Sequence, residues 1–161
     1  MALVDDLDQL IRLHDRELDG ETLAALKATE FPAGLALAPA DDLAAQAYAN
    51  AQAALVALPA VADTKVLDEL AADYAAIYLN NSFGASTYES VWLDDDHLAC
   101  QRPMFELREI YAASGFKAAD WRSRYDDHLV MQLHYLRHLL QADAVDGEKM
   151  ANFIDEHIGY W

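Results

Sequence analysis

Histidine side chains one helical turn apart are the first feature of the sequence that could do chemistry, because two imidazoles on one helix face can grip a metal ion. His134 and His138 have this spacing. Tyr135 stands where the metalloprotease pattern H-E-x-x-H has Glu. A third ligand would have to come from Asp127 or from residues 94–97 (Asp-Asp-Asp-His). We therefore expect no metal site, and two partly exposed histidines on a helix surface.

Sequence patterns of other catalysts are also missing. Ser90 has no G-x-S-x-G surround, and Cys100 lies three residues from His97, a spacing that implies no catalytic geometry. There is no Gly-rich phosphate loop, Walker lysine or dinucleotide fingerprint. The sequence therefore predicts no catalytic residues and no enzyme.

Charge narrows the class of partner. The 161 residues include 28 acidic and 11 basic ones, for a formal net charge of −17. Nucleic-acid binding needs clustered Lys and Arg, and anionic lipid also repels such a surface. Residues 101–125 are the exception, with five basic and three acidic residues, or net +2. The charged residues of that window either form ordinary ion pairs on a helix surface or make a basic patch beside an acidic groove. The negative charge of the rest of the chain favours a cationic partner.

Composition indicates a folded protein of the cytoplasm. Hydrophobic residues make up 54% of the chain and aromatic residues 10%, too much for a disordered acidic tail. The single cysteine, Cys100, excludes an internal disulfide. Asp5, Asp6 and Asp8 occupy the N-terminal region, where a secretory signal would be basic, and no uncharged apolar run is long enough to span a membrane. We expect a cytoplasmic protein without stable membrane insertion.

The elements that must position any site are helices. Apolar spacing, aspartate caps and Gly or Pro stops predict helices at 2–18, at 21–28, at 42–57 after Asp41, from Asp63 or Thr64 to Tyr78, from Pro103 to Gly115, at 126–141 after an Asp126 cap, and from Gly147 onward. The expected fold is one all-α helical-bundle domain over residues 1–161.

Residues 80–101 break the helical pattern and predict an irregular loop. Within them, the run Tyr88-Glu89-Ser90-Val91-Trp92-Leu93 is short and aromatic, so we expect a structured loop or a brief extended segment. The large rings in or near this region are Tyr78, Phe83, Tyr88, Trp92 and Trp121. They either capture a peptide or simply plug the loop onto the core.

The order of several motifs resembles the TorD/DmsD family of redox-enzyme maturation chaperones, which includes the NarJ relatives. The resemblance covers about residues 70–161 and rests on Asp73-Tyr74-x-x-Ile77-Tyr78-Leu79, on Tyr88-Glu89-Ser90-Val91-Trp92-Leu93, on Arg108 in a Pro-started helix followed by Gly115, on Asp126-Asp127-His128-Leu129, and on Phe153-Ile154-x-x-His157-x-x-x-Trp161. The chain departs from the family at Thr87, where Pro is usual, and at Arg124-Tyr125, where the family has Glu-Pro.

The resemblance also predicts what is absent. Relatives usually continue beyond the position of Trp161, so we expect a short or truncated member that lacks the family's C-terminal helices. It would then be a monomer or a homodimer that exchanges helices.

The resemblance implies an all-helical cytoplasmic chaperone. Its partners would be the twin-arginine signal peptide and the apo form of a molybdopterin-containing oxidoreductase of the DMSO or TMAO reductase type, with no nucleic acid. It would assist cofactor insertion before export. It implies no resident cofactor beyond a weak contact with guanine nucleotide or the molybdopterin cofactor. Alternative functions are a helical scaffold or assembly subunit of a respiratory reductase without signal-peptide binding, and a weak guanine-nucleotide switch.

The peptide-binding groove predicted on this basis is lined by Tyr78, Tyr88, Glu89, Ser90, Trp92, Arg108, Asp127 and His128. Glu89 and Asp127 would meet the peptide arginines, since carboxylates hold a guanidinium fork. Tyr88 and Trp92 would pack the apolar segment, and His128 would bond to peptide backbone or support the groove from behind. The alternative for Asp127 and His128 is a helix cap beside a satisfied histidine.

Overall fold

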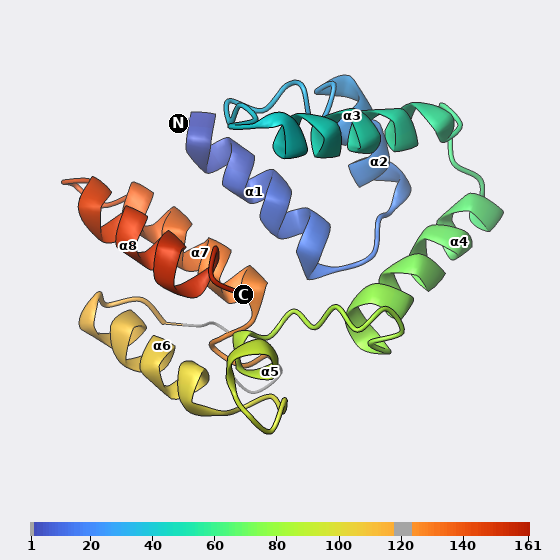
Figure 1. Cartoon of the computed structure of the whole chain (residues 1–161). Helices are drawn as coiled ribbons and strands as arrows, with labels where there is room; N and C mark the ends of the chain where they lie inside the picture. The colour runs from blue at the N-terminus through green and yellow to red at the C-terminus, as the bar shows by residue number, and fades with distance from the viewer. Residues whose placement is uncertain (1, 118–123) are drawn as a thin grey trace. The chain divides into compact units, whose positions relative to one another are not determined.

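Helices account for nearly all regular structure in the computed structural model, which describes residues 2–117 and 124–161 (Figure 1). Those ranges contain no strand, and their one isolated bridge joins Tyr88 to His128. The prediction of an all-α fold is therefore confirmed. The chain divides into two compact units, one ending at Asn80 and the other beginning at Asn81. That the whole chain is one domain stays a prediction.

Aspartate caps set the helix starts of the first unit. Its elements are α1 (Ala2–Asp15), α2 (Gly20–Ala28), α3 (Asp42–Ala57), α4 (Thr64–Tyr74) and the π-helical turn η1 (Ala75–Leu79). The carboxylates of Asp19, Asp41 and Asp63 accept hydrogen bonds from the amides of Thr22, Ala44 and Val66. Each bond satisfies a donor that a helix start leaves without a partner. The predicted caps Asp41 and Asp63 are confirmed.

The buried apolar side chains of this unit come from α1 and α2. They are Leu7, Ile11, Leu23 and Leu26. The amides of Ala36 and Leu37 bond to the buried carboxylate of Asp6, at 3.1 and 2.8 Å, and so attach the connection before α3 to α1. By contrast, α3 and α4 bury no residue.

The second unit contains α5 (Glu89–Leu93), α6 (Arg102–Ala113), α7 (Leu129–Leu140) and α8 (Gly147–His157). As expected, Pro103 lies in the first turn of α6, where its missing N–H costs nothing, and Gly115 follows the helix at φ +71°, which favours glycine. Asp146 caps α8 through the amide of Lys149. The buried apolar residues of the second unit are Met104, Leu107, Tyr111, Val130, Met131, Leu133, Tyr135, Leu136, Leu139 and Phe153.

The helices differ from the prediction at several points. The first helix ends at Asp15 rather than at residue 18. The run from Tyr88 to Leu93 is not extended, because a helical turn, α5, begins at Glu89 within the predicted irregular loop. The helix expected to start after Asp126 begins at Leu129, and its cap is His128.

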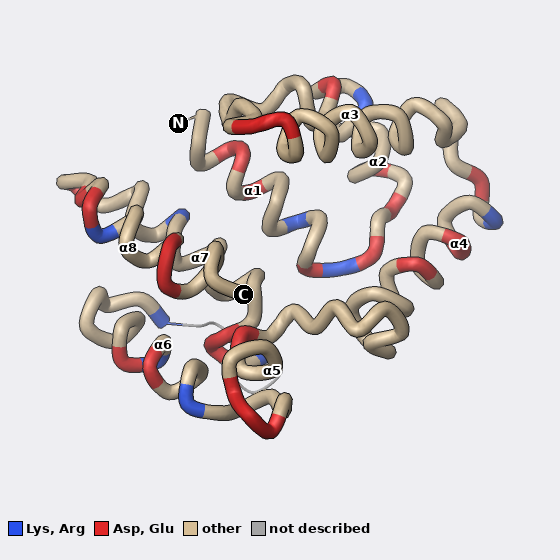
Figure 2. Tube along the Cα trace, viewed as in Figure 1, with Lys and Arg blue, Asp and Glu red and all other residues tan. Residues whose placement is uncertain are grey.

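Acidic residues occur on helices of both units, although α7 carries none (Figure 2). None of the helices in the described ranges combines the length and the apolar character that crossing a membrane requires. Within residues 2–117 and 124–161, no group of three or more His, Cys, Asp or Glu side chains is placed to hold a metal ion. His138 lies half-buried, with Nε2 3.1 Å from the carbonyl oxygen of Ser114.

Candidate functional site

The starts of α5 and α7 are tied together by backbone pairing. The amide of Leu129 donates to the carbonyl of Thr87 at 2.9 Å, and the amide of Glu89 donates to the carbonyl of Asp127 at 3.1 Å. These two bonds flank the antiparallel bridge between Tyr88 and His128. Two motifs that lie far apart in the sequence therefore form one site.

Asp127 caps α5 from across this pairing. Its side chain is fully buried (0% exposed), and its Oδ2 accepts from the amide of Ser90 at 2.9 Å. The residue preceding α5, Tyr88, supplies no capping side chain of its own. Burial raises the pKa of the Asp127 carboxyl, while the bonds from Ser90 oppose that rise. The Oδ1 atom has no hydrogen-bond partner in the described part of the chain.

His128 caps α7 with its side chain. Nδ1 accepts from the amide of Val130 at 3.0 Å, so the ring proton belongs on Nε2. Nε2 lies 3.0 Å from Oγ1 of Thr87 and donates to it. Thr87, the residue that replaces the family's usual proline, thus provides the acceptor that fixes the histidine. The ring of Tyr88 meets the imidazole edge-on, with centroids 4.8 Å apart.

A buried polar cluster lies behind α5. The carboxylate of Glu89 is 1% exposed and accepts from Nε2 of Gln132 at 2.7 Å. Nδ1 of His157 lies 3.1 and 3.3 Å from its two oxygens. Burial raises the pKa of Glu89, and His157 counteracts part of that rise. We call Glu89, Asp127, Gln132 and His157 the buried polar cluster.

Arg108 is already engaged within the molecule. Its Nε and Nη2 atoms lie 2.9 and 2.8 Å from Oδ2 of the buried Asp126. The backbone carbonyl of Asp126 accepts from the hydroxyl of Tyr111 at 3.0 Å. The guanidinium also sits 5.7 Å from the ring centroid of Phe105. Arg108 therefore fixes the segment that precedes His128.

Aromatic rings reach solvent in front of the cluster. Trp92 is 46% exposed and Tyr125 is 39% exposed, while Tyr88 is half-buried. Ser86 orients two of these residues, because its carbonyl accepts from the indole N–H of Trp92 at 2.9 Å and its Oγ accepts from the amide of Tyr88 at 3.2 Å. The rings of Tyr88 and Tyr125 lie 5.8 Å apart. We call Tyr88, Trp92 and Tyr125 the ring surface.

The predicted site residues divide between the two units. Tyr78 belongs to the first unit, where its hydroxyl lies 2.6 Å from Nδ1 of His14 and its ring stacks on Tyr74. The second unit holds the remaining predicted residues: Tyr88, Glu89, Ser90, Trp92, Arg108, Asp127 and His128. Phe83 is exposed in the loop before α5, and Trp121 lies outside the described residues.

The carboxylates of Glu89 and Asp127 point into the protein and not toward solvent as predicted. Glu89 and Asp127 were expected to present their charge to a ligand, yet both are buried and bonded to neighbours. They act on the site by holding α5 in place. Of the residues in the predicted basic window, Arg102 makes an ordinary surface ion pair with Glu106 at 2.8 Å.

Sequence reasoning missed two members of the cluster. Gln132 is a polar residue on the buried side of α7, and that polarity within an apolar stripe is the signal that could have identified it. His157 appears in a family motif but carried no assigned role. Only the fold brings it against Glu89.

Comparison with known proteins places the chain in a family. Residues 40–161 match the model of the family described as nitrate reductase delta subunit. The chain is also 30% identical, over 103 residues, to proteins named chaperone protein TorD from strains of Vibrio cholerae serotype O1. That alignment covers 58% of this chain and 46% of each relative, so the chain spans about half the length of the curated relatives it matches.

No solved structure matches the chain. The family that does match is one of chaperones rather than catalysts. The resemblance carried by the motifs around α5 and α7 is confirmed, and the chain belongs to the nitrate reductase delta subunit family, the TorD/DmsD-like chaperones of redox-enzyme maturation.

Proposed function

We propose that this protein is a cytoplasmic chaperone that binds the twin-arginine signal peptide and the apo form of a molybdopterin-containing oxidoreductase of the DMSO or TMAO reductase type. It holds this client until the cofactor is inserted, and so delays export. The molybdopterin cofactor is that of the client. No phosphate-cradling loop in the sequence supports a nucleotide-driven switch.

The ring surface is the observation that carries this proposal. Solvent-exposed aromatic side chains on a rigid support offer contact area at little entropic cost. Here the support is held in place, because Asp127 caps α5 and Glu89 anchors it to α7 and α8. Tyr88 and Trp92 would pack against the apolar segment of the signal peptide.

Charge supports the arginine part of the proposal. A net charge of −17 raises the rate at which a cationic leader meets the protein. Bulk attraction does not distinguish arginine from lysine, whereas a fitted site does, since only arginine presents a planar fork of donors. Selectivity for arginine is therefore the property to measure.

The test is a binding titration with two peptides that differ only in the pair of basic residues. One carries the twin-arginine motif followed by an apolar segment, and the other carries two lysines in the same positions. We expect tighter binding of the arginine peptide. Equal binding of both would reduce the interaction to bulk electrostatics, and binding of neither would refute the proposed function.

An assembly subunit of a respiratory reductase is the second candidate, and the description of the matched family favours it. Such a protein would bind the apoenzyme without its leader. Capture of apoenzyme with and without the signal peptide separates the two functions, because the chaperone is expected to lose affinity when the leader is removed. Whether the protein is a monomer or exchanges helices in a dimer stays a prediction.

A further inference from the structure

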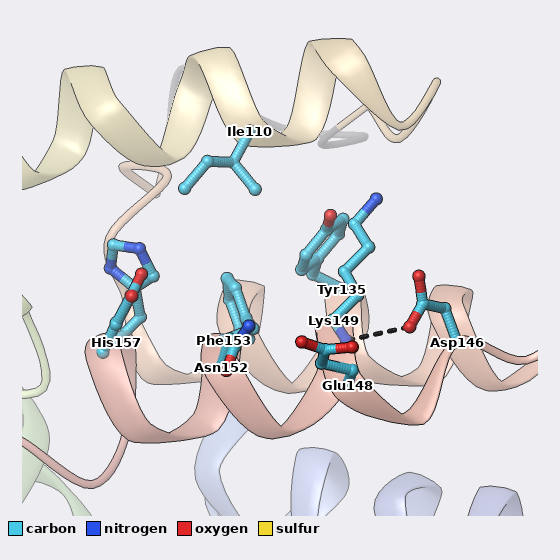
Figure 3. Close-up of a pocket in the computed structure, with 9 residues that line it drawn as sticks. Ile110, Tyr135, Asp146, Glu148, Lys149, Asn152, Phe153 and His157 are labelled. Atoms are coloured by element: carbon cyan, nitrogen blue, oxygen red, sulfur yellow. Dashed lines mark hydrogen bonds between the residues drawn. The ribbon is translucent and has the colours of Figure 1, made fainter.

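A pocket of about 370 Å³ lies along α8 and is lined by residues of α6, α7 and α8 within the second unit (Figure 3). Tyr135 and Phe153 form its aromatic floor, with ring centroids 4.7 Å apart. Ile110 reaches from α6 toward these rings. Its volume is at the lower end of the range for ligand sites, about 300–1,000 Å³.

The spacing of residues on α8 gives the pocket an acidic rim. Glu148, Asn152 and Glu156 follow each other at intervals of four and therefore stand in one row along the helix. Phe153 and His157 belong to the next row, nearer the floor. An arginine side chain is complementary to such a rim, because the edge of its guanidinium plane donates to oxygen acceptors.

The charged side chains at the two ends of the pocket differ in whether they have hydrogen-bond partners within the protein. At the start of α8, Lys149 contributes a positive charge and donates from Nζ to Oγ of Ser114 at 2.7 Å. At the other end, Glu156 forms no hydrogen bond or ion pair with any side chain in the described ranges. Glu156 is also in the last turn of α8, where the helix dipole favours a cation. The Glu156 end is therefore where a cationic group would bind.

We propose that this pocket binds an arginine side chain of the client's leader, with the exposed Glu156 carboxylate and the exposed Asn152 side-chain oxygen accepting from the guanidinium. This inference rests on the proposed function and assigns it a specific arginine site. A metal ion is a poorer occupant, since the described residues offer no group of three ligands for one.

The pocket is linked to the ring surface through one imidazole. His157 lines the pocket, and its Nδ1 contacts Glu89 at the start of α5. Glu89 belongs to the cluster that holds α5 in position. An arginine that enters the pocket therefore lies beside His157, the residue that contacts Glu89 in the same helix as Trp92.

The test compares Glu156→Gln with Asp155→Asn. Both substitutions remove one negative charge from the last turn of α8, and Asp155 is exposed and does not line the pocket. Loss of a charged hydrogen-bond partner predicts that E156Q weakens binding of the twin-arginine peptide about tenfold. D155N should weaken binding of the twin-arginine peptide only slightly, through the loss of bulk attraction. Either variant should weaken binding of the twin-lysine peptide by that same small amount. Equal effects of E156Q and D155N on both peptides would overturn the inference.

A small-molecule titration separates the pocket from the proposed function. N-acetyl-arginine amide at millimolar concentration should shift the NMR signals of Asn152 and Phe153 in the wild-type protein, and the lysine analogue should not. If the arginine peptide binds while these signals stay still, the pocket inference fails and the function stands. If the signals move but neither peptide binds, the function fails and the pocket stands.

Discussion

The Oδ2 atom of Asp127 lies 2.9 Å from the backbone nitrogen of Ser90, a residue 37 positions earlier in the chain. This contact supplies the start of α5 with an acceptor that its own preceding residue, Tyr88, does not provide. Because α5 has only five residues, it depends on such long-range contacts more than a longer helix would. The buried carboxylate of Asp127 therefore helps to hold the short helix that contains Trp92.

Replacing Asp127 by Ala should lower the free energy of unfolding by about 1–3 kcal/mol, since it leaves the Ser90 amide buried without a partner. Asp127→Asn retains a side-chain oxygen at that position and should lose less. Urea unfolding measures both changes, and Asp95→Ala, at an exposed position beyond α5, is the control. Equal stability of D127A and D95A would contradict the capping role.

Glu89 should make stability fall as the pH rises. Burial raises its pKa above the ordinary value of 4.5, so native Glu89 keeps its proton to a higher pH than unfolded Glu89 does. The native state then binds more protons between the two pKa values. The contribution of Glu89 to the free energy of unfolding is therefore present below the unfolded pKa and is lost as the pH rises through the folded pKa.

Unfolding free energies measured upward from about pH 4.5 test this sign. Wild-type stability should decline more steeply with pH than that of Glu89→Gln, whose side chain has no proton to lose in this window. Glu109→Gln removes an exposed carboxyl of α6 and should leave the wild-type slope unchanged. A slope for E89Q that matches the wild type would show that Glu89 titrates normally.

Local chemistry was sufficient to predict most helix boundaries. Asp41 and Asp63 cap the helices that follow them, and Gly115 follows the end of α6, because each feature acts within a few residues of itself. Asp126 failed as a predicted cap for the opposite reason. Its carboxylate is taken by Arg108, which is 18 positions away, and this contact leaves the capping of α7 to His128.

The sequence predicted which residues lie near the starts of α5 and α7 better than it predicted how their side chains are oriented. Glu89 and Asp127 were selected as carboxylates that face a ligand, but each finds buried partners on a distant segment. No local pattern reveals that Gln132 and His157 will meet Glu89. For the aromatic residues the sequence left open whether they bind a peptide or cover the core, and the structure shows Trp92 to be 46% exposed.

Arg108 should matter more for stability than for peptide binding. Its guanidinium places two donors on one oxygen of the buried Asp126, and Arg108→Ala would leave that carboxylate without its cation. Arg108 itself is about half exposed, so we expect a loss of about 1–2 kcal/mol rather than the larger cost of a fully buried pair. Arg108→Lys keeps the charge without the fork and should fall between wild type and R108A in urea unfolding. A loss of peptide affinity in R108A without any loss of stability would indicate direct contact with the ligand instead.

Trp92 should matter more for peptide binding than for stability. Its ring is 46% exposed and its single hydrogen bond goes to the backbone of Ser86, so Trp92→Ala should change the free energy of unfolding by less than about 1 kcal/mol. If the ring surface binds the leader, the same variant should lower affinity for the twin-arginine peptide at least about tenfold, as exposed tryptophans at interface centres do. Tyr160→Ala removes a ring that is 73% exposed outside this surface, and it should bind like the wild type. Equal affinity of W92A and Y160A would show that the peptide does not bind at α5. Trp92 is the most exposed ring of the ring surface, so a peptide bound there would be sensitive to its loss.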